Sequence, residues 1–228
     1  MTVTTCIFDA YGTLFDVSAA ARQAAAEPEF ERIAGCWQAI AEHWRLKQLQ
    51  YTWLRAVAHA HTDFWTVTGD GLEWALERNG FAGDTVLYDR LMALYRELQA
   101  YPEVPEMLAA LKAGGMNTAI LSNGAPDMLA AAVASAGIGD VLDDTLSVES
   151  VGVFKPDARV YDLVCQRFGC EKSQVLFVSS NGWDAGCATG YGFTTAWVNR
   201  AKEPVDRLPW RPAHIIPDLT GIPALAGA

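Results

Sequence analysis

Short apolar segments of strand length alternate with helix-length segments over most of the chain, and this alternation limits the possible folds most strongly. The apolar segments end in turn or polar residues, as strands do, and they span residues 4–8, 117–122, 175–179, 194–198 and, more weakly, 214–216. Helix-length segments lie between several of them, at residues 105–113, 126–136, 158–168 and 183–191. The pattern predicts an α/β fold, with a Rossmann-like parallel sheet covered by helices on both faces.

Residues 18–97 interrupt this alternation because they offer only helical patterns. Apolar residues recur every three or four places over residues 31–58, 63–78 and 84–97. The simplest organisation is a discontinuous core domain of residues 1–16 and 98–228, with an inserted helical cap subdomain of residues 17–97. A single continuous mixed domain is the alternative, but it leaves the first strand far in sequence from its partners.

Composition excludes several classes of partner. About half of the 228 residues are hydrophobic, which is enough for a sizeable core, and the formal charge of -10 with no long basic run argues against nucleic acid. The five cysteines form no CxxC pair, so we expect unpaired thiols in a reducing compartment. With no signal-like N-terminus and no apolar stretch of membrane-spanning length, we predict a cytoplasmic protein without a membrane partner.

Polar residues follow the ends of the predicted strands, where an open parallel sheet places its binding crevice. Any one of them could be an ordinary helix cap or turn residue. Together they indicate a site, since acids, a lysine, hydroxyls and amides meet at one sheet edge. These residues are Asp9, Thr13, Ser122, Asn123, Lys155, Ser179, Asn181 and Asp184.

Four segments in order, "FDAYGTLFD", "LSNG", "FKPDARVY" and "FVSSNGWD", resemble the motifs of the haloacid dehalogenase superfamily. Most members of that superfamily are phosphatases. The segment "WRLKQLQYTWLR" and the "SSNGWD" ending resemble the L-2-haloacid dehalogenase branch in particular. The resemblance covers nearly the whole chain and implies a Rossmann-like core with a helical cap.

Tyr11 separates the two kinds of activity. The phosphatases of the superfamily have a D-x-D motif at this position, and its second aspartate protonates the leaving group. They hold magnesium with further acids in a G-D-x-x-x-D stretch. This chain has Tyr11 and Ser180 at two of those acidic positions. Halide leaves as a stable anion and needs no general acid, so the resemblance implies a dehalogenase with no metal and no cofactor.

The resemblance also implies catalytic roles. Asp9 is the expected nucleophile, which attacks the halogen-bearing carbon, inverts it and forms an ester. Lys155 is expected to keep Asp9 ionised, and Asp184 to orient or deprotonate the water that cleaves the ester. The remaining residues of the expected catalytic group are Ser179, Asn181 and Thr13.

Halide and substrate sites follow from the same resemblance. The expected halide-binding residues are Arg45, Asn123 and Phe64, and the expected substrate-binding residues are Ser122, Tyr161, Tyr11, Leu49 and Trp183. From periodicity alone, Arg45 fits a solvated helix position and the apolar residues fit an ordinary core equally well. The four expected charges, Asp9, Asp184, Arg45 and Lys155, sum to zero, so the empty pocket could accept a monoanionic acid.

The implied reaction is hydrolytic dehalogenation of short L-2-haloalkanoic acids to 2-hydroxy acids, with a haloalkanoate, water and halide as the only partners apart from a possible homodimer. Two alternatives stay open. One is a magnesium-dependent phosphatase of the same superfamily, and the other is a non-catalytic relative that binds small acids. The preferred halogen, including fluoride, does not follow from residue identity.

Overall fold

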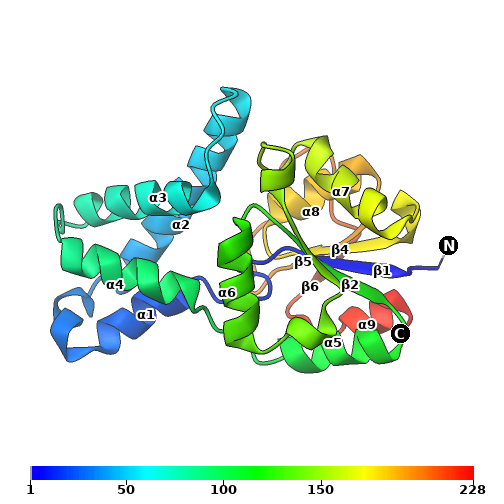
Figure 1. The fold of residues 1–228 in the computed structure, drawn as a ribbon, viewed down its shortest axis with the longest axis horizontal. Helices are drawn as coiled ribbons and strands as arrows, with labels where there is room; N and C mark the ends of the chain where they lie inside the picture. The colour runs from blue at the N-terminus through cyan, green and yellow to red at the C-terminus, as the bar shows by residue number, and fades with distance from the viewer. Residues whose placement is uncertain (1) are drawn as a thin grey trace.

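A six-stranded, wholly parallel sheet forms the centre of the computed structural model, which describes residues 2–228 (Figure 1). The strand order is β3-β2-β1-β4-β5-β6. The strands are Thr5–Phe8 (β1), Asn117–Ser122 (β2), Asp144–Ser147 (β3), Val175–Ser179 (β4), Thr194–Val198 (β5) and His214–Ile216 (β6).

The register of the central strands determines where the polar residues meet. Every residue of β1 and β4 is buried, as expected for strands covered on both faces. Phe8 at the end of β1 pairs with Ile120 on one side and with Val178 on the other. The residues that follow these three positions therefore lie along one edge of the sheet.

Helices cover both faces of the sheet, which confirms the predicted fold class. Figure 1 shows α7 and α8 on one side of the sheet and α5 and α9 on the other. The helices that follow β1 and the cap region are Val104–Ala113 (α5), Pro126–Ala136 (α6), Ala158–Phe168 (α7), Gly182–Tyr191 (α8) and Ile222–Ala226 (α9).

Four further helices, here called the cap helices, lie beside the sheet rather than on its faces (Figure 1). They are Ala19–Ala26 (α1), Trp37–Val57 (α2), Phe64–Arg78 (α3) and Thr85–Arg96 (α4). Asp63 and Asp84 cap α3 and α4 by accepting backbone N–H bonds from Thr66 and Leu87. The division into core and cap at residues 16/17 and 97/98 stays a prediction.

The prediction of one helix over residues 31–58 is wrong at its start. Residues Pro28–Ile33 form a short 3-10 helix in which Phe30 has the non-helical angles φ -114° and ψ 21°. The long helix α2 begins only at Trp37, after Cys36 at φ -142°. The chain therefore bends before α2, and the periodicity over residues 31–36 does not belong to that helix.

The cysteines and the helices can be compared with the sequence analysis. All five cysteines are unpaired. Within residues 2–228, none of the helices combines the length and the apolar character that crossing a bilayer requires.

Candidate active site

Asp9 lies directly after β1 and accepts hydrogen bonds on both carboxylate oxygens. Lys155 Nζ donates to Oδ1 at 3.2 Å, and Asn181 Nδ2 donates to Oδ2 at 3.0 Å. Thr13 Oγ1 also lies 3.1 Å from Oδ2. The side chain of Asp9 is 8 % exposed. It is thus held in one orientation at the edge of the sheet, as the sequence predicts for Asp9.

Lys155 joins the two buried acids of the site. Its ammonium group is 3.2 Å from Asp9 Oδ1 and 2.8 Å from Asp184 Oδ2, and its side chain is 1 % exposed. Burial opposes the lysine charge, but the carboxylates of Asp184 and Asp9 outweigh burial and hold the pKa of Lys155 above its usual value. The ammonium form is therefore the stable one.

Asp184, near the start of α8, is fully buried and differs from Asp9 in its surroundings. Burial raises the pKa of the Asp184 carboxyl; the ammonium of Lys155 acts against this, and the charge of Asp9 adds to it. Tyr161 donates its hydroxyl to Asp184 Oδ1 at 2.7 Å. Burial also raises the pKa of Tyr161 well above the usual tyrosine value, so its hydroxyl stays a neutral donor.

The turn after Asp9 brings Thr13 next to β4. Ser180 donates its backbone N–H to Thr13 Oγ1 at 2.8 Å, and the two hydroxyls lie 3.2 Å apart. Gly12 has φ +89°, and a Cβ at this position would lie 3.0 Å from Ser180 Oγ. Glycine thus permits both the positive φ and the close approach to Ser180.

Arg45 reaches the sheet edge from α2. Its Nη2 atom donates to the Tyr11 carbonyl oxygen at 3.0 Å and to Asn181 Oδ1 at 3.2 Å, and its Nη1 atom donates to Gln48 Oε1 at 2.8 Å. The guanidinium therefore lies beside Asn181, which also contacts Asp9. The cap helices thus contribute a cation to the group formed at the strand ends.

The side chains at this edge enclose a small cavity with a free volume of about 10 Å³. That volume is close to the ~10–15 Å³ that one water molecule requires. The site is therefore narrow, and Arg45 takes up part of it through its contacts with Tyr11 and Asn181. The wall consists of Asp9, Tyr11, Arg45, Leu49, Phe64, Ser122, Asn123, Lys155, Asn181 and Trp183.

Four predicted site residues lie outside that wall. Asp184 and Tyr161 lie behind Lys155, and Ser179 Oγ accepts the backbone N–H of Asn181 at 3.1 Å. Thr13 contacts Asp9 from the side of β4. Direct contact between substrate and Tyr161 does not fit this arrangement, since its hydroxyl points to Asp184.

Ser122 and Asn123 lie in the wall as the sequence predicts, but each also stabilises the loop that follows β2. Ser122 Oγ accepts the backbone N–H of Gly124 at 3.0 Å. Asn123 Oδ1 accepts the backbone N–H of Lys155 at 2.9 Å, so its amide nitrogen is the end left for a ligand.

Sequence reasoning missed Gln48 and Tyr95, which lie behind Arg45. Both are buried, and the Gln48 amide contacts the Tyr95 hydroxyl at 3.1 Å. Gln48 follows Ile40 and Trp44 at intervals of four on the buried side of α2. That spacing could have identified Gln48 from the sequence, because a polar residue on the buried side of a helix needs hydrogen-bond partners.

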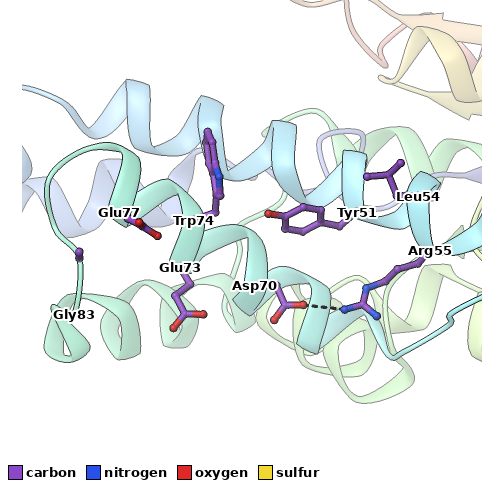
Figure 2. A pocket seen from close by; sticks show the side chains of 9 residues that line it. Tyr51, Leu54, Arg55, Asp70, Glu73, Trp74, Glu77 and Gly83 are labelled. Carbon is purple, nitrogen blue, oxygen red and sulfur yellow. Dashed lines mark hydrogen bonds and ion pairs between the residues drawn. The ribbon is translucent and has the colours of Figure 1, made fainter. Parts of the chain in front are cut away.

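A larger open groove lies elsewhere, on the cap helices (Figure 2). It has a volume of about 510 Å³, and the ion pair between Arg55 and Asp70, 3.1 Å long, lies at one end. Its walls are Tyr51, Leu54, Arg55, Asp70, Glu73, Trp74, Glu77, Ala82 and Gly83, none of which contributes to the cavity at Asp9. Size alone therefore does not locate the reactive groups.

The position of the second phosphatase aspartate is occupied by a packed aromatic ring. Tyr11 stacks on Tyr95 with 5.4 Å between ring centroids and lies 5.7 Å from the ring of Phe64. Across residues 2–228, no three histidine, cysteine or acidic side chains lie close enough together to hold a metal ion.

Comparison with known proteins assigns the chain to a family. Residues 3–190 match the haloacid dehalogenase-like hydrolases. The chain belongs to this family. Over 220 residues, this chain is 41% identical to (S)-2-haloacid dehalogenase 1 of Pseudomonas sp. (strain CBS-3). The match covers 96% of this chain and 95% of that protein.

Further haloacid dehalogenases are similar. (S)-2-haloacid dehalogenase 4A of Burkholderia cepacia is 42% identical over 199 residues, which cover 87% of this chain and 84% of that protein. The crystal structure of L-2-haloacid dehalogenase from Xanthobacter autotrophicus with chloropropionic acid covalently bound superposes with a TM-score of 0.86 at 37% identity. The match covers 100% of this chain and 99% of the chain in that structure.

Proposed function

We propose that this chain is an (S)-2-haloacid dehalogenase, which hydrolyses short L-2-haloalkanoic acids to 2-hydroxy acids with inversion. One observation supports this most directly: Asp9, held by Lys155, and the Arg45 cation line the same small cavity, and both contact Asn181. The relatives named above support the substrate class. The possible homodimer and the cytoplasmic location stay predictions.

In the first step, a carboxylate oxygen of Asp9 forms a bond to C2 of the acid while the carbon–halogen bond breaks. The halide leaves with the bonding electron pair, and Arg45 and the amide of Asn123 are the groups that would receive it. No proton is needed for this departure, which fits Tyr11 at the position of the phosphatase acid. Leu49, Phe64 and Trp183 supply the apolar wall that keeps bulk water away from the nucleophile.

In the second step, a water oxygen adds to the Asp9 carboxyl carbon, and the bond between that carbon and the ester oxygen breaks. Asp184 accepts one proton of the water along the hydrogen bonds of Lys155, and the departing hydroxy acid takes that proton up. The raised pKa of Asp184 makes this carboxylate a better proton acceptor than an ordinary aspartate. The second proton of the water is released from the Asp9 carboxyl to solvent, so Asp9 returns to its ionised form with one oxygen from water.

Substrate binding requires the site to open. The cavity has room for about one water molecule, and a three-carbon acid is several times larger, so the side chains around the cavity must move apart. Movement of Arg45 would enlarge the cavity, since this side chain lines it and contacts Tyr11 and Asn181.

The test is halide release from both enantiomers of 2-chloropropionate by chelator-treated protein. We expect chloride from the (S) enantiomer, and we expect Asp9→Asn to lower kcat by about 10⁴-fold or more because the nucleophile is lost. With excess enzyme in heavy-oxygen water, the first product should carry unlabelled oxygen and Asp9 should then become labelled.

Two outcomes would contradict the proposal. Magnesium-dependent consumption of phosphate esters without halide release would favour the phosphatase. Binding of small acids with no turnover, unchanged in Asp9→Asn, would favour the non-catalytic relative.

A further inference from the structure

The guanidinium of Arg45 is held by neutral oxygens. Its three acceptors are the Tyr11 carbonyl, the Asn181 amide and the Gln48 amide. None of the ion pairs found within residues 2–228 includes Arg45. Its full charge therefore remains for an anion, provided that the side chain is kept in place.

The orientation of the Gln48 amide follows from its hydrogen bonds. Thr68 Oγ1 donates to the Phe64 carbonyl at 2.7 Å, so it accepts the bond from Gln48 Nε2 at 2.8 Å. Gln48 Nε2 also lies 3.1 Å from the Tyr95 hydroxyl. With its nitrogen bound on that side, the amide can present only its oxygen to Arg45.

Burial makes this arrangement rigid. Gln48, Thr68 and Tyr95 are 1 %, 0 % and 3 % exposed, so none of them can exchange its partners for bulk water. The backbone is also close, since a Cβ on Gly71 of α3 would lie 3.1 Å from the backbone nitrogen of Gln48. Rotation of the Gln48 amide would therefore leave buried donors and acceptors unpaired.

We propose that Gln48 is a positioning residue for halide release: its amide, locked by Thr68 and Tyr95, holds the Arg45 guanidinium at the cavity by a neutral acceptor. The inference rests on the proposed function and adds a residue to it. Neutrality matters because a carboxylate at this place would pair with the guanidinium and compete with the halide. A buried polar residue on α2 thereby acts at the reacting centre through Arg45 alone.

The experiment measures bromide affinity by calorimetry, together with the ratio of kcat for 2-bromopropionate to kcat for 2-chloropropionate. Gln48→Met keeps the length of the side chain but removes the acceptor. We expect its bromide Kd to rise about tenfold, as for a lost hydrogen bond to a charged group. The kcat ratio should rise about fivefold, since chloride, the poorer leaving group, depends more on Arg45. Gln48→Glu should weaken bromide binding by at least as much, although it retains an acceptor.

Thr68→Val and Thr52→Val form a matched pair of controls. Both threonines are buried, Thr52 on α2 and Thr68 on α3. Thr52 Oγ1 donates only to the Leu49 carbonyl of its own helix. We expect both variants to lose stability and only Thr68→Val to weaken bromide binding, by about threefold or more. If Gln48→Met does not fold, the comparison of these two threonine variants decides the question.

The proposal is overturned if folded Gln48→Met keeps the bromide Kd and the kcat ratio of the unchanged protein, or if the unchanged protein binds no bromide. A failure of the proposed function is distinguishable from both, because it appears as absent halide release in the unchanged protein, whatever its bromide affinity.

Discussion

At the scale of single residues, one ammonium group serves two acids with different surroundings. Asp9 receives hydrogen bonds on both oxygens and lies in the cavity wall, whereas Asp184 lies behind Lys155 without reaching the wall. Burial raises the pKa of Asp184, with Lys155 acting against that effect. Two carboxylates of one cluster are thereby suited to different tasks, attack and proton transfer.

Tyr161→Phe should shift the acid limb of the kcat profile to higher pH. In the proposed mechanism Asp184 acts as a base only when ionised, so activity is expected to fall as the pH falls through its pKa. The Tyr161 hydroxyl stabilises the ionised form and lowers that pKa. Without the hydroxyl, the carboxylate protonates at a higher pH, and kcat at pH 6 should fall more than kcat at pH 9.

Tyr191→Phe is the matched control for Tyr161→Phe. The Tyr191 ring packs 5.4 Å from that of Tyr161, but its hydroxyl donates to Asp162, outside the site. Its kcat profile should keep the position of the acid limb. An equal shift in both variants would show that loss of packing, rather than of the hydrogen bond, is the cause.

The strand ends were predictable from sequence, whereas the residues behind them were not. Asp9, Ser122 and Asn181 follow apolar runs, and in a parallel sheet such positions must converge. Gln48 and Tyr95 converge only because α2 and α4 approach each other in space, and no local pattern records that approach.

At the scale of secondary-structure elements, the first turn of α3 is part of the cavity. Phe64 is the first residue of that helix and lines the wall, and Asp63 before it caps the helix. The cap accepts from the Thr66 backbone N–H at 2.9 Å and from the Thr66 hydroxyl at 2.8 Å. The cap therefore determines where an aromatic wall residue lies.

Asp63→Ala should lower the free energy of unfolding by about 1 kcal/mol, the usual value of a helix N-cap. It should also raise KM for 2-chloropropionate, because fraying of the first turn displaces Phe64. Thermal melts and initial rates measure the two effects. Asp63→Asn retains an acceptor and should stay close to the unchanged protein in both; a KM unaffected by Asp63→Ala would separate the cap from the cavity wall.

Elements with strong patterns were predicted to within about a residue, and the misses have physical reasons. The strand β3 reads Asp-Thr-Leu-Ser, lies at the edge of the sheet and buries only its last residue, so it has no apolar run. The helix α1 contains six alanines among its eight residues, and alanine provides too little contrast to show which side is buried.

At the scale of the whole molecule, the cap helices and the sheet domain meet through contacts between residues distant in sequence. His61 Nε2 lies 2.9 Å from Glu149 Oε2, and the His61 ring lies 4.7 Å from that of Phe154. On another side, the rings of Trp53 and Trp183 meet at 5.3 Å. These contacts, together with those of Arg45, join the cap helices to the sheet domain beside the cavity.

Glu149→Gln should weaken the closed arrangement by up to about 1 kcal/mol, the usual limit for a pair that is partly exposed to solvent. We expect KM for 2-chloropropionate to rise by up to about fivefold with a small change in kcat. His61→Gln should have the same effect, and the double variant should add little, since either change removes the same pair.

Asp70→Asn provides the comparison for Glu149→Gln, because the pair of Asp70 with Arg55 lies within the cap helices and joins nothing to the sheet. It should leave KM unchanged. Equal effects of Asp70→Asn and Glu149→Gln would show that general surface charge, and not the contact between cap and sheet, is responsible.

The tight enclosure of Asp9 has a consequence for the speed of the enzyme. A haloacid can arrive, and a hydroxy acid and a halide can depart, only while Arg45 and its neighbours are withdrawn. Turnover therefore cannot exceed the frequency at which Arg45 and its neighbours withdraw, however fast the carbon–halogen bond breaks. The 2-bromo and 2-iodo acids, whose halides leave easily, should then share one maximal rate, which is set by the motion of the protein rather than by the halogen.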